Sequence, residues 1–269
     1  MTVLSAHALE QAALWSTDAE GWSLYGEPHN EPLFHDVLRA AAEALGRRLL
    51  DVGCGTGRVL QLASADGWTV TGVDVAEPLL VIAADRLGPE NVRVAESEDL
   101  PFDDGSFDAV VGVNAFQFAA DPARALGEAA RVLAPGGRVV ASLFAEPERS
   151  QATAVHEAMS ALVDAAQPPS TPTHAPYLLS AAGNLEMVLA GAGLEVVGAG
   201  ETECVWAYPD ADAAARGILS SAGGARASSI VGRDAVADTV RAAVVPFTGP
   251  TGEVRMRTTF RWVSATKGV

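Results

Sequence analysis

The sequence predicts one α/β domain whose mostly parallel sheet is covered by helices on both faces, and three observations lead to this prediction. Between residues 48 and 144, short β-branched runs alternate with Ala- and Leu-rich segments of helical length, which is the order of successive βαβ units. The apolar runs are continuous rather than alternating, as strands buried on both faces require. The first run leads into the glycine-rich stretch LLDVGCGTGRV, residues 49–59, which is typical of a turn from a strand into a helix.

The segment before the first strand, residues 1–45, is expected to form an N-terminal helical lid. It is rich in aromatic residues and reads as one or two helices around the loop GEPHNEP. In a parallel sheet, ligands bind at the carboxyl ends of the strands, and an N-terminal segment of this kind is suited to cover them.

The segment 46–145 is expected to supply the ligand-binding core. Its strands are expected in RLLDVG, TVTGVD, NVRVAE, FDAVVGVNAF and RVVASLF. Asp121 is a good helix N-cap before Pro122, since proline at the first helical position needs no amide donor. The PGG at 135–137 then ends this helix.

The rest of the chain is expected to add two cap inserts, 146–180 and 208–250, to the same domain. Ser180 is expected to cap a helix running to Ala192, and Asp210 to cap the second insert. GLEVVGAG predicts another strand, and the final segment, 251–269, predicts a last strand with one polar face. The chain 1–269 is therefore expected to be a single domain.

The composition limits the partners of the chain. The formal net charge is −16, and such a surface repels phosphate backbones and anionic lipids, so we expect neither a nucleic acid nor a membrane partner. Cys54 and Cys204 lack a metal-binding spacing and are expected to be reduced thiols. The sequence shows no signal peptide and no long apolar span, so we expect a cytoplasmic protein. Its oligomeric state is not predicted.

The three glycines after the first strand, Gly53, Gly55 and Gly57, leave the backbone bare where a ligand could approach. A tight turn alone would also explain them. A dinucleotide-binding turn would need a third glycine at the position of Arg58. The spacing is instead GxGxG, with Asp51 two residues upstream.

Four ordered motifs carry a resemblance to a known family: LLDVGCGTG, VTGVD, EDLPFDDGSFDAVV and RVLAPGGRVV. In this order and spacing the chain resembles the class I S-adenosylmethionine-dependent methyltransferases. It is most similar to the small-molecule branch that includes quinone-biosynthesis and polyketide-tailoring enzymes. The resemblance is strong over 45–145 and looser toward the C-terminus. It implies a Rossmann-like fold with a seven-stranded, mostly parallel sheet, and S-adenosylmethionine as the cofactor, released as S-adenosylhomocysteine.

The resemblance also implies roles for residues at the strand ends. Asp51 would counter the ammonium of the cofactor and the amides of the glycine loop its carboxylate, while Asp74 would accept the ribose hydroxyls. Val75 and Leu79 would sandwich the adenine. The adenine edge would be read by the Glu96 carboxylate and the Ser97 amide, although the family usually has Asp-Ala at these two positions. Asn114 would lie against the methionine part, and the acceptor pocket would include Tyr25, Phe116 and Gln117.

Methyl transfer from a sulfonium mainly requires that two reactants be aligned and water excluded. A general base is needed only for an acceptor that carries a proton, such as a phenol. His29 and His174 lie in expected lid segments and are the candidates, although a packing role explains either as well. No metal is expected.

The sequence therefore predicts methyl transfer to the O, C or N atom of a small, fairly apolar molecule in a lidded pocket. The alternative is a protein that binds S-adenosylmethionine without methylating, either a regulatory module or a cyclase or decarboxylase on the same fold. An NAD-dependent oxidoreductase is disfavoured by Arg58.

Overall fold

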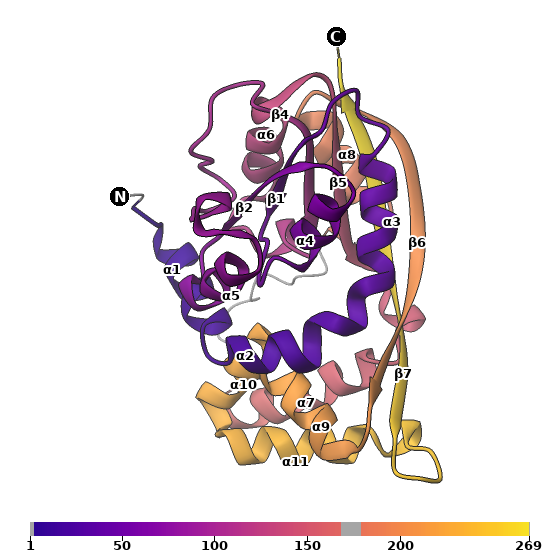
Figure 1. Ribbon diagram of the computed structural model, residues 1–269. Coiled ribbons are helices and arrows are strands. Elements are labelled where there is room, and N and C mark those ends of the chain that lie inside the picture. The colour runs from indigo at the N-terminus through magenta and orange to yellow at the C-terminus, as the bar shows by residue number, and fades with distance from the viewer. Residues whose placement is uncertain (1–2, 168–178, 269) are drawn as a thin grey trace.

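Seven strands form one sheet in the order β3–β2–β1–β4–β5–β7–β6 (Figure 1). The computed structural model describes residues 3–167 and 179–268. Neighbours from β3 to β5 are parallel, whereas β7 is antiparallel to both β5 and β6. The predicted Rossmann-like fold with a mostly parallel sheet is confirmed. The strands are β1 (Arg48–Val52), β2 (Thr69–Asp74), β3 (Val92–Val94), β4 (Phe107–Val113), β5 (Leu133–Phe144), β6 (Leu194–Tyr208) and β7 (Val254–Lys267).

Helices cover both faces of this sheet because its strands are apolar on both sides. In β1, Leu49 belongs to the core shared with α3 and α4, whereas its neighbour Leu50 belongs to the core shared with α6 and α8. Both leucines are fully buried, as the continuous apolar run predicts. The helices around the sheet are α3 (Glu31–Ala41), α4 (Arg58–Ala65), α5 (Glu77–Leu87), α6 (Pro122–Val132) and α8 (Asn184–Gly191), with the short 3-10 helix η3 (Pro89–Asn91) after α5.

The predicted helix starts are correct at two positions and wrong at a third. The Asp121 carboxylate accepts from the amides of Ala123 and Arg124 at 3.0 and 3.1 Å, and so caps α6. Asp210 caps the next insert in the same way. Ser180 does not begin α8, because the helix starts only after Gly183, whose left-handed φ of 82° makes the turn.

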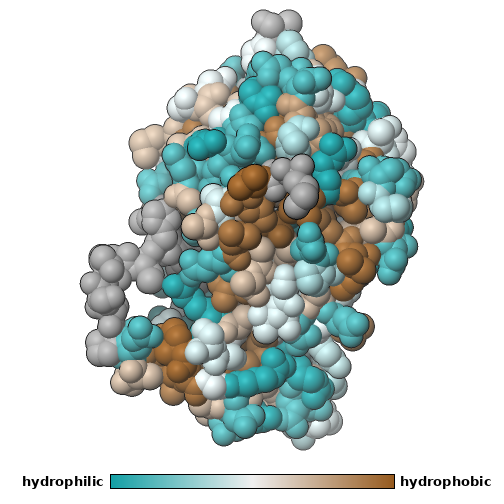
Figure 2. Space-filling view, turned by 90° about the vertical axis from the view of Figure 1, so that its left-hand side faces the viewer, coloured by the Kyte–Doolittle hydropathy of each residue, from teal (hydrophilic) through white to brown (hydrophobic). Residues whose placement is uncertain are grey.

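The N-terminal segment is divided between two locations. It consists of α1 (Ala6–Trp15), α2 (Ala19–Gly21), the π-helix η1 (Trp22–Gly26) and the 3-10 helix η2 (Glu27–Asn30), followed by α3. Leu33 and Val37 of α3 are fully buried against the sheet, so α3 is a core helix and only the segment before it can act as a lid. On the face that carries α1 and α5, apolar side chains gather at the middle of the view (Figure 2).

A separate helical layer lies beyond the end of the sheet, at the bottom of Figure 1. The long strands β6 and β7 extend into this layer, and α9 contacts η1 of the N-terminal segment. The polar face predicted for β7 is exposed at the start of the strand, where Arg255 and Arg257 alternate with the buried Val254 and Met256. The layer contains α7 (Thr153–Ala166), α9 (Ala211–Leu219), α10 (Ala222–Val231) and α11 (Arg233–Ala243), with the short helices η5 (Pro147–Arg149) and η6 (Val245–Phe247) beside it.

Within the part of the chain that the structure describes, no helix is both long and apolar enough to cross a membrane.

Candidate functional site

The glycine loop between β1 and α4 combines three left-handed glycines with different surroundings. Gly53, Gly55 and Gly57 have φ values of 72°, 53° and 79°, which side chains rarely allow. A Cβ on Gly53 would lie 2.6 Å from Cβ of Ala115, and one on Gly57 would lie 3.0 Å from Cβ of Ala83. A Cβ on Gly55 would meet nothing within 4 Å. Two of the glycines therefore permit packing, and Gly55 presents bare backbone to open space.

The amides of this loop are mostly bonded within the protein, which differs from the expectation that they would hold a ligand carboxylate. The amides of Gly53 and Cys54 donate to the carbonyl of Val73 at 2.8 and 2.9 Å. The Gly57 amide donates to the carbonyl of Cys54 at 2.9 Å. The glycines thus serve the shape of the loop rather than the supply of donors.

Asp74, at the carboxyl end of β2, is buried beside the loop and is held by backbone donors. Its Oδ2 accepts from the Gly55 amide and its Oδ1 from the Ala76 amide, both at 2.9 Å. Burial raises the pKa of this carboxyl, and the backbone hydrogen bonds oppose that shift. A carboxylate offers about four lone-pair sites, so Asp74 can accept further hydrogen bonds in the orientation that these two amides fix.

Asp51, in β1, is almost fully buried, and its Oδ1 has no hydrogen-bond partner among the described residues. The pKa of this carboxyl is raised well above its usual range, first by burial and then by the negative charges of Asp74 and Glu27. A buried carboxyl without a partner is costly, and a cationic ligand would remove that cost.

Glu96 and Ser97 follow β3, but their side chains already have partners in the protein. Oε2 of Glu96 accepts from the hydroxyl and the amide of Ser5, at 2.6 and 3.2 Å. The Ser97 hydroxyl donates to Glu98 at 2.7 Å. Glu96 therefore anchors the start of α1, and sequence reasoning missed this contact because the two residues are 91 positions apart.

The loop after β4 places two polar side chains at the same edge of the sheet as the glycine loop. Asn114 is the one non-glycine residue with a positive φ (54°) among the described residues, and its Oδ1 is buried without a partner. Gln117, in the 3-10 helix η4 (Phe116–Phe118), is buried, and both atoms of its amide lack partners. Phe116, which the sequence predicts in the acceptor pocket, packs instead in the α6-side core, where its ring lies against Gly112.

The other predicted pocket residues lie around this edge in different environments. Val75 is half-buried, and Leu79 is buried in a small cluster with Ala76 on which two indole rings pack. Tyr25 belongs to η1, and its ring lies under the Arg216 guanidinium, 5.2 Å from the ring centroid.

Of the two predicted histidines, His29 contacts the end of β6. Its Nε2 lies 2.8 Å from the carbonyl oxygen of Ala207, and its ring lies 4.5 Å from that of Tyr208. Its Nδ1 is buried and has no partner among the described residues. Because a carbonyl can only accept, this contact requires a proton on Nε2, and in the neutral ring Nδ1 is then the acceptor. His174 lies outside the described residues.

The N-terminal segment is attached directly to the glycine loop by a partly buried ion pair, which sequence reasoning missed. Glu27 of η2 is buried, accepts from the Thr56 hydroxyl, and pairs with Arg86 of α5 at 2.8 Å. Arg86 also donates to the Thr56 carbonyl at 2.9 Å and to the Ser23 hydroxyl at 2.8 Å. We call Glu27, Thr56 and Arg86 the lid lock.

No cluster of metal ligands occurs in residues 3–167 and 179–268.

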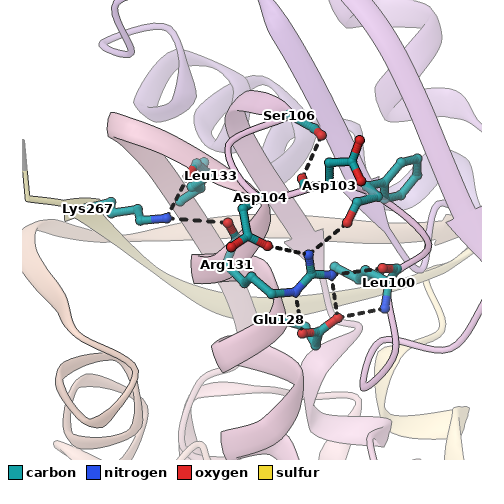
Figure 3. Close-up of polar contacts among 9 residues, drawn as sticks. Leu100, Asp103, Asp104, Ser106, Glu128, Arg131, Leu133 and Lys267 are labelled. Atoms are coloured by element: carbon teal, nitrogen blue, oxygen red, sulfur yellow. Dashed lines mark hydrogen bonds and ion pairs between the residues drawn. The ribbon is translucent and has the colours of Figure 1, made fainter.

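The motifs EDLPFDDGSFDAVV and RVLAPGGRVV meet in a hydrogen-bond network that holds the loop between β3 and β4 (Figure 3). Arg131 of α6 pairs with Glu128 and Asp104 at 2.7 and 2.9 Å, and donates to the carbonyls of Phe102 and Leu100. Glu128 accepts in turn from the Leu100 amide at 2.9 Å. The bonds to Arg131 lower the pKa of Glu128. These motifs therefore fix the chain that returns from the edge of the site.

Residues 50–141 match the family described as methyltransferase domain. A demethylmenaquinone methyltransferase of Clavibacter sepedonicus is 40% identical over 114 residues, covering 41% of this chain and 46% of that protein. A demethylmenaquinone methyltransferase of Thermus thermophilus is 41% identical over 115 residues, covering 40% of this chain and 52% of that protein. The matched region thus spans about half the length of these curated relatives.

Solved structures share the fold over most of the chain. An S-adenosylmethionine-dependent methyltransferase of Thermotoga maritima superposes with a TM-score of 0.54 at 20% identity, covering 96% of this chain and 99% of that one. The [4+2]-cyclase SpnF superposes with a TM-score of 0.53 at 22% identity, covering 88% of this chain and 81% of that one. The family match includes the end of β1, the glycine loop and the Arg131 network described above. Residues 50–141 of this chain therefore form a methyltransferase domain, set in a seven-stranded fold that solved S-adenosylmethionine-dependent methyltransferases share.

Proposed function

We propose that this protein transfers a methyl group from S-adenosylmethionine to the O, C or N atom of a small, fairly apolar molecule. The observation that carries the proposal is Asp51, a buried carboxyl at the glycine loop whose Oδ1 has no partner among the described residues. S-adenosylmethionine brings an ammonium group and an activated sulfonium methyl, and the methyltransferase domain over 50–141 makes it the expected ligand.

The neighbouring residues fit the other parts of this cofactor. Gly55 exposes backbone without a side chain to obstruct approach. Asp74 has free acceptor capacity for a pair of hydroxyl groups, in an orientation fixed by two amides. Neither role requires the lysine of a phosphate-binding loop, nor a glycine at the position of Arg58 as in a dinucleotide-binding turn.

The acceptor is expected to enter between this edge and the helical layer. Tyr25 and His29 come from η1 and η2, which belong to the lid. Enclosure by these elements would exclude water and align the two reactants, which can lower the barrier by roughly 7–11 kcal/mol. The demethylmenaquinone methyltransferases among the relatives favour a small apolar acceptor over a macromolecule.

Calorimetric titration with S-adenosylmethionine tests the cofactor, and Asp51→Asn provides the matched variant. We expect the wild type to bind and the variant to lose at least ~10-fold in affinity, since it removes the charge that meets the ammonium. A wild type that does not bind, or a variant that binds equally well, would contradict the assignment.

Methyl-labelled cofactor, incubated with an extract of the source organism, tests the reaction. Label in the small-molecule fraction supports the proposal, and label in protein or RNA overturns the acceptor class. A cofactor that binds but never transfers label would favour the alternative of a non-methylating protein, because SpnF shows that the fold is not restricted to methyltransferases.

His29 is the proposed general base for an acceptor that carries a proton. In His29→Asn the rate with such an acceptor should fall by about 10²–10⁴, the usual contribution of a base. The fall should shrink as the pH rises toward the pKa of the acceptor, because the deprotonated acceptor needs no base. A pH-independent loss would instead indicate that His29 only packs against Tyr208.

A further inference from the structure

The inner face of α1 spans the ends of three strands at the cofactor edge. At its start, Ser5 binds Glu96 after β3. His7 Nε2 lies 2.8 Å from the carbonyl oxygen of Phe118 after β4. Trp15 packs on the cluster of Ala76 and Leu79 after β2. This face of α1 therefore covers the area enclosed by the ends of β2, β3 and β4, next to Asp74.

Gln11 lies at the centre of this face. Positions four apart share one side of a helix, so Gln11 lies between His7 and Trp15. Both of these neighbours contact Phe118, the first through its carbonyl oxygen and the second ring to ring at 5.9 Å. Gln11 therefore points toward η4, which also carries Gln117.

Three amide atoms in this area are buried and have no partner among the described residues: Oε1 of Gln11, and Oε1 and Nε2 of Gln117. Buried polar atoms are nearly always bonded, so each one left unpaired indicates a missing partner. Two carbonyl oxygens and one NH₂ group require a ligand with both donors and acceptors on one edge.

The area adjoins Asp74, and adenine has the required edge. Its 6-amino group donates and its adjacent ring nitrogens accept, which is why side-chain amides bind adenine in pairs of hydrogen bonds. Ser5 bonds Oε2 of Glu96, the carboxylate predicted to accept from this amino group, and so joins the start of α1 to that predicted adenine contact. We infer that Gln11 and Gln117 together read the adenine of the cofactor, so that α1 sets the base specificity of the site. The inference depends on the proposed cofactor.

Calorimetric titration with S-adenosylhomocysteine and S-inosylhomocysteine tests it by binding alone. In the inosyl ligand an oxygen replaces the amino group and the adjacent nitrogen becomes a donor, so the hydrogen-bond pattern is inverted. We expect the wild type to prefer the adenosyl ligand by at least ~10-fold. Gln11→Leu and Gln117→Leu should each reduce this ratio. Glu10→Ala is the control, because Glu10 lies on the same helix but pairs with Arg226 at 3.2 Å.

The outcomes separate this inference from the proposed function. Unchanged ratios in both leucine variants, with circular dichroism showing that they are folded, would overturn the inference while leaving the cofactor assignment intact. A changed KM for the methyl acceptor, with an unchanged ratio of affinities for the adenosyl and inosyl ligands, would also overturn the inference. It would show that the two glutamines contact the acceptor instead of the adenine. If the wild type bound neither ligand, the proposed function itself would fail.

Discussion

Asp51 illustrates how a single residue can favour ligand binding at the expense of stability. Its pKa is raised by burial and by two neighbouring carboxylates, so the folded protein holds this proton more tightly than the unfolded chain does. Below the pKa that Asp51 has in the unfolded chain, its protonation stabilises the fold in full. This stabilisation is lost as the pH rises from that value through the higher pKa of the folded protein. Above the raised pKa, the ligand-free protein therefore carries the cost of a buried charge.

Asp51→Asn should consequently raise the melting temperature of the ligand-free protein. The gain should be small near pH 4, where both forms are neutral, and should grow with pH until the wild-type carboxyl is fully ionised. Each kcal/mol regained corresponds to roughly 2–4 °C for a domain of this size. Thermal melts from pH 4 to 8 measure this dependence. A variant less stable than the wild type at pH 8 would show that Asp51 has a structural partner that the site does not reveal.

The residue scale also shows what the sequence could predict. The turn built by Gly53, Gly55 and Gly57 and the position of Asp74 follow from local patterns, because strand, turn and helix are adjacent in the chain. The partner of Glu96 and the contact at the Phe118 carbonyl both come from α1 or its N-cap, about a hundred positions away in sequence. No local pattern encodes such contacts, and none distinguishes a core phenylalanine at position 116 from one that lines a pocket.

At the scale of elements, the motifs around α6 hold the chain in place rather than bind a ligand. Arg131 joins its own helix to the loop between β3 and β4, and the chain's single lysine, Lys267, donates to the carbonyl of Leu133 at 2.8 Å (Figure 3). The end of β7 is thereby tied to the end of α6. The family motifs around Arg131 thus have a structural explanation at this position.

Arg131→Ala should therefore lower the free energy of unfolding by more than it weakens the free energy of cofactor binding. Loss of hydrogen bonds to a charged group costs about 1.5–3 kcal/mol, and Glu128 would be left without its cation. Because Arg131 lowers the pKa of Glu128, that stabilisation is present above the unfolded pKa and is lost as the pH falls. Urea unfolding at pH 7 and pH 4 should show a large difference between variant and wild type at pH 7 and a smaller one at pH 4. Equal differences would contradict this account.

At the scale of the whole molecule, the lid lock joins elements that the sequence keeps apart. The predicted division assigns consecutive segments of the chain to lid, core and inserts. In the structure, α3, which lies within the predicted lid segment, belongs to the core, and η2 attaches to the glycine loop through Glu27. Opening the N-terminal segment requires breaking a partly buried ion pair, so the lid and the loop that shapes the cofactor site should move together.

Glu27→Ala should open this segment and disturb the glycine loop at the same time. Removing Glu27 leaves the partly exposed Arg86 guanidinium without its carboxylate, which should cost less than the ~3–5 kcal/mol of a fully buried pair. Hydrogen exchange should then become faster in residues 22–31 and also in residues 53–57, and the cofactor should dissociate faster. The double variant Glu27→Gln with Arg86→Met, which leaves no unpaired charge, should recover part of the stability but not the slow exchange of the segment. Faster exchange confined to residues 22–31 would mean that the loop keeps its shape without the lid, and that the lock serves stability alone.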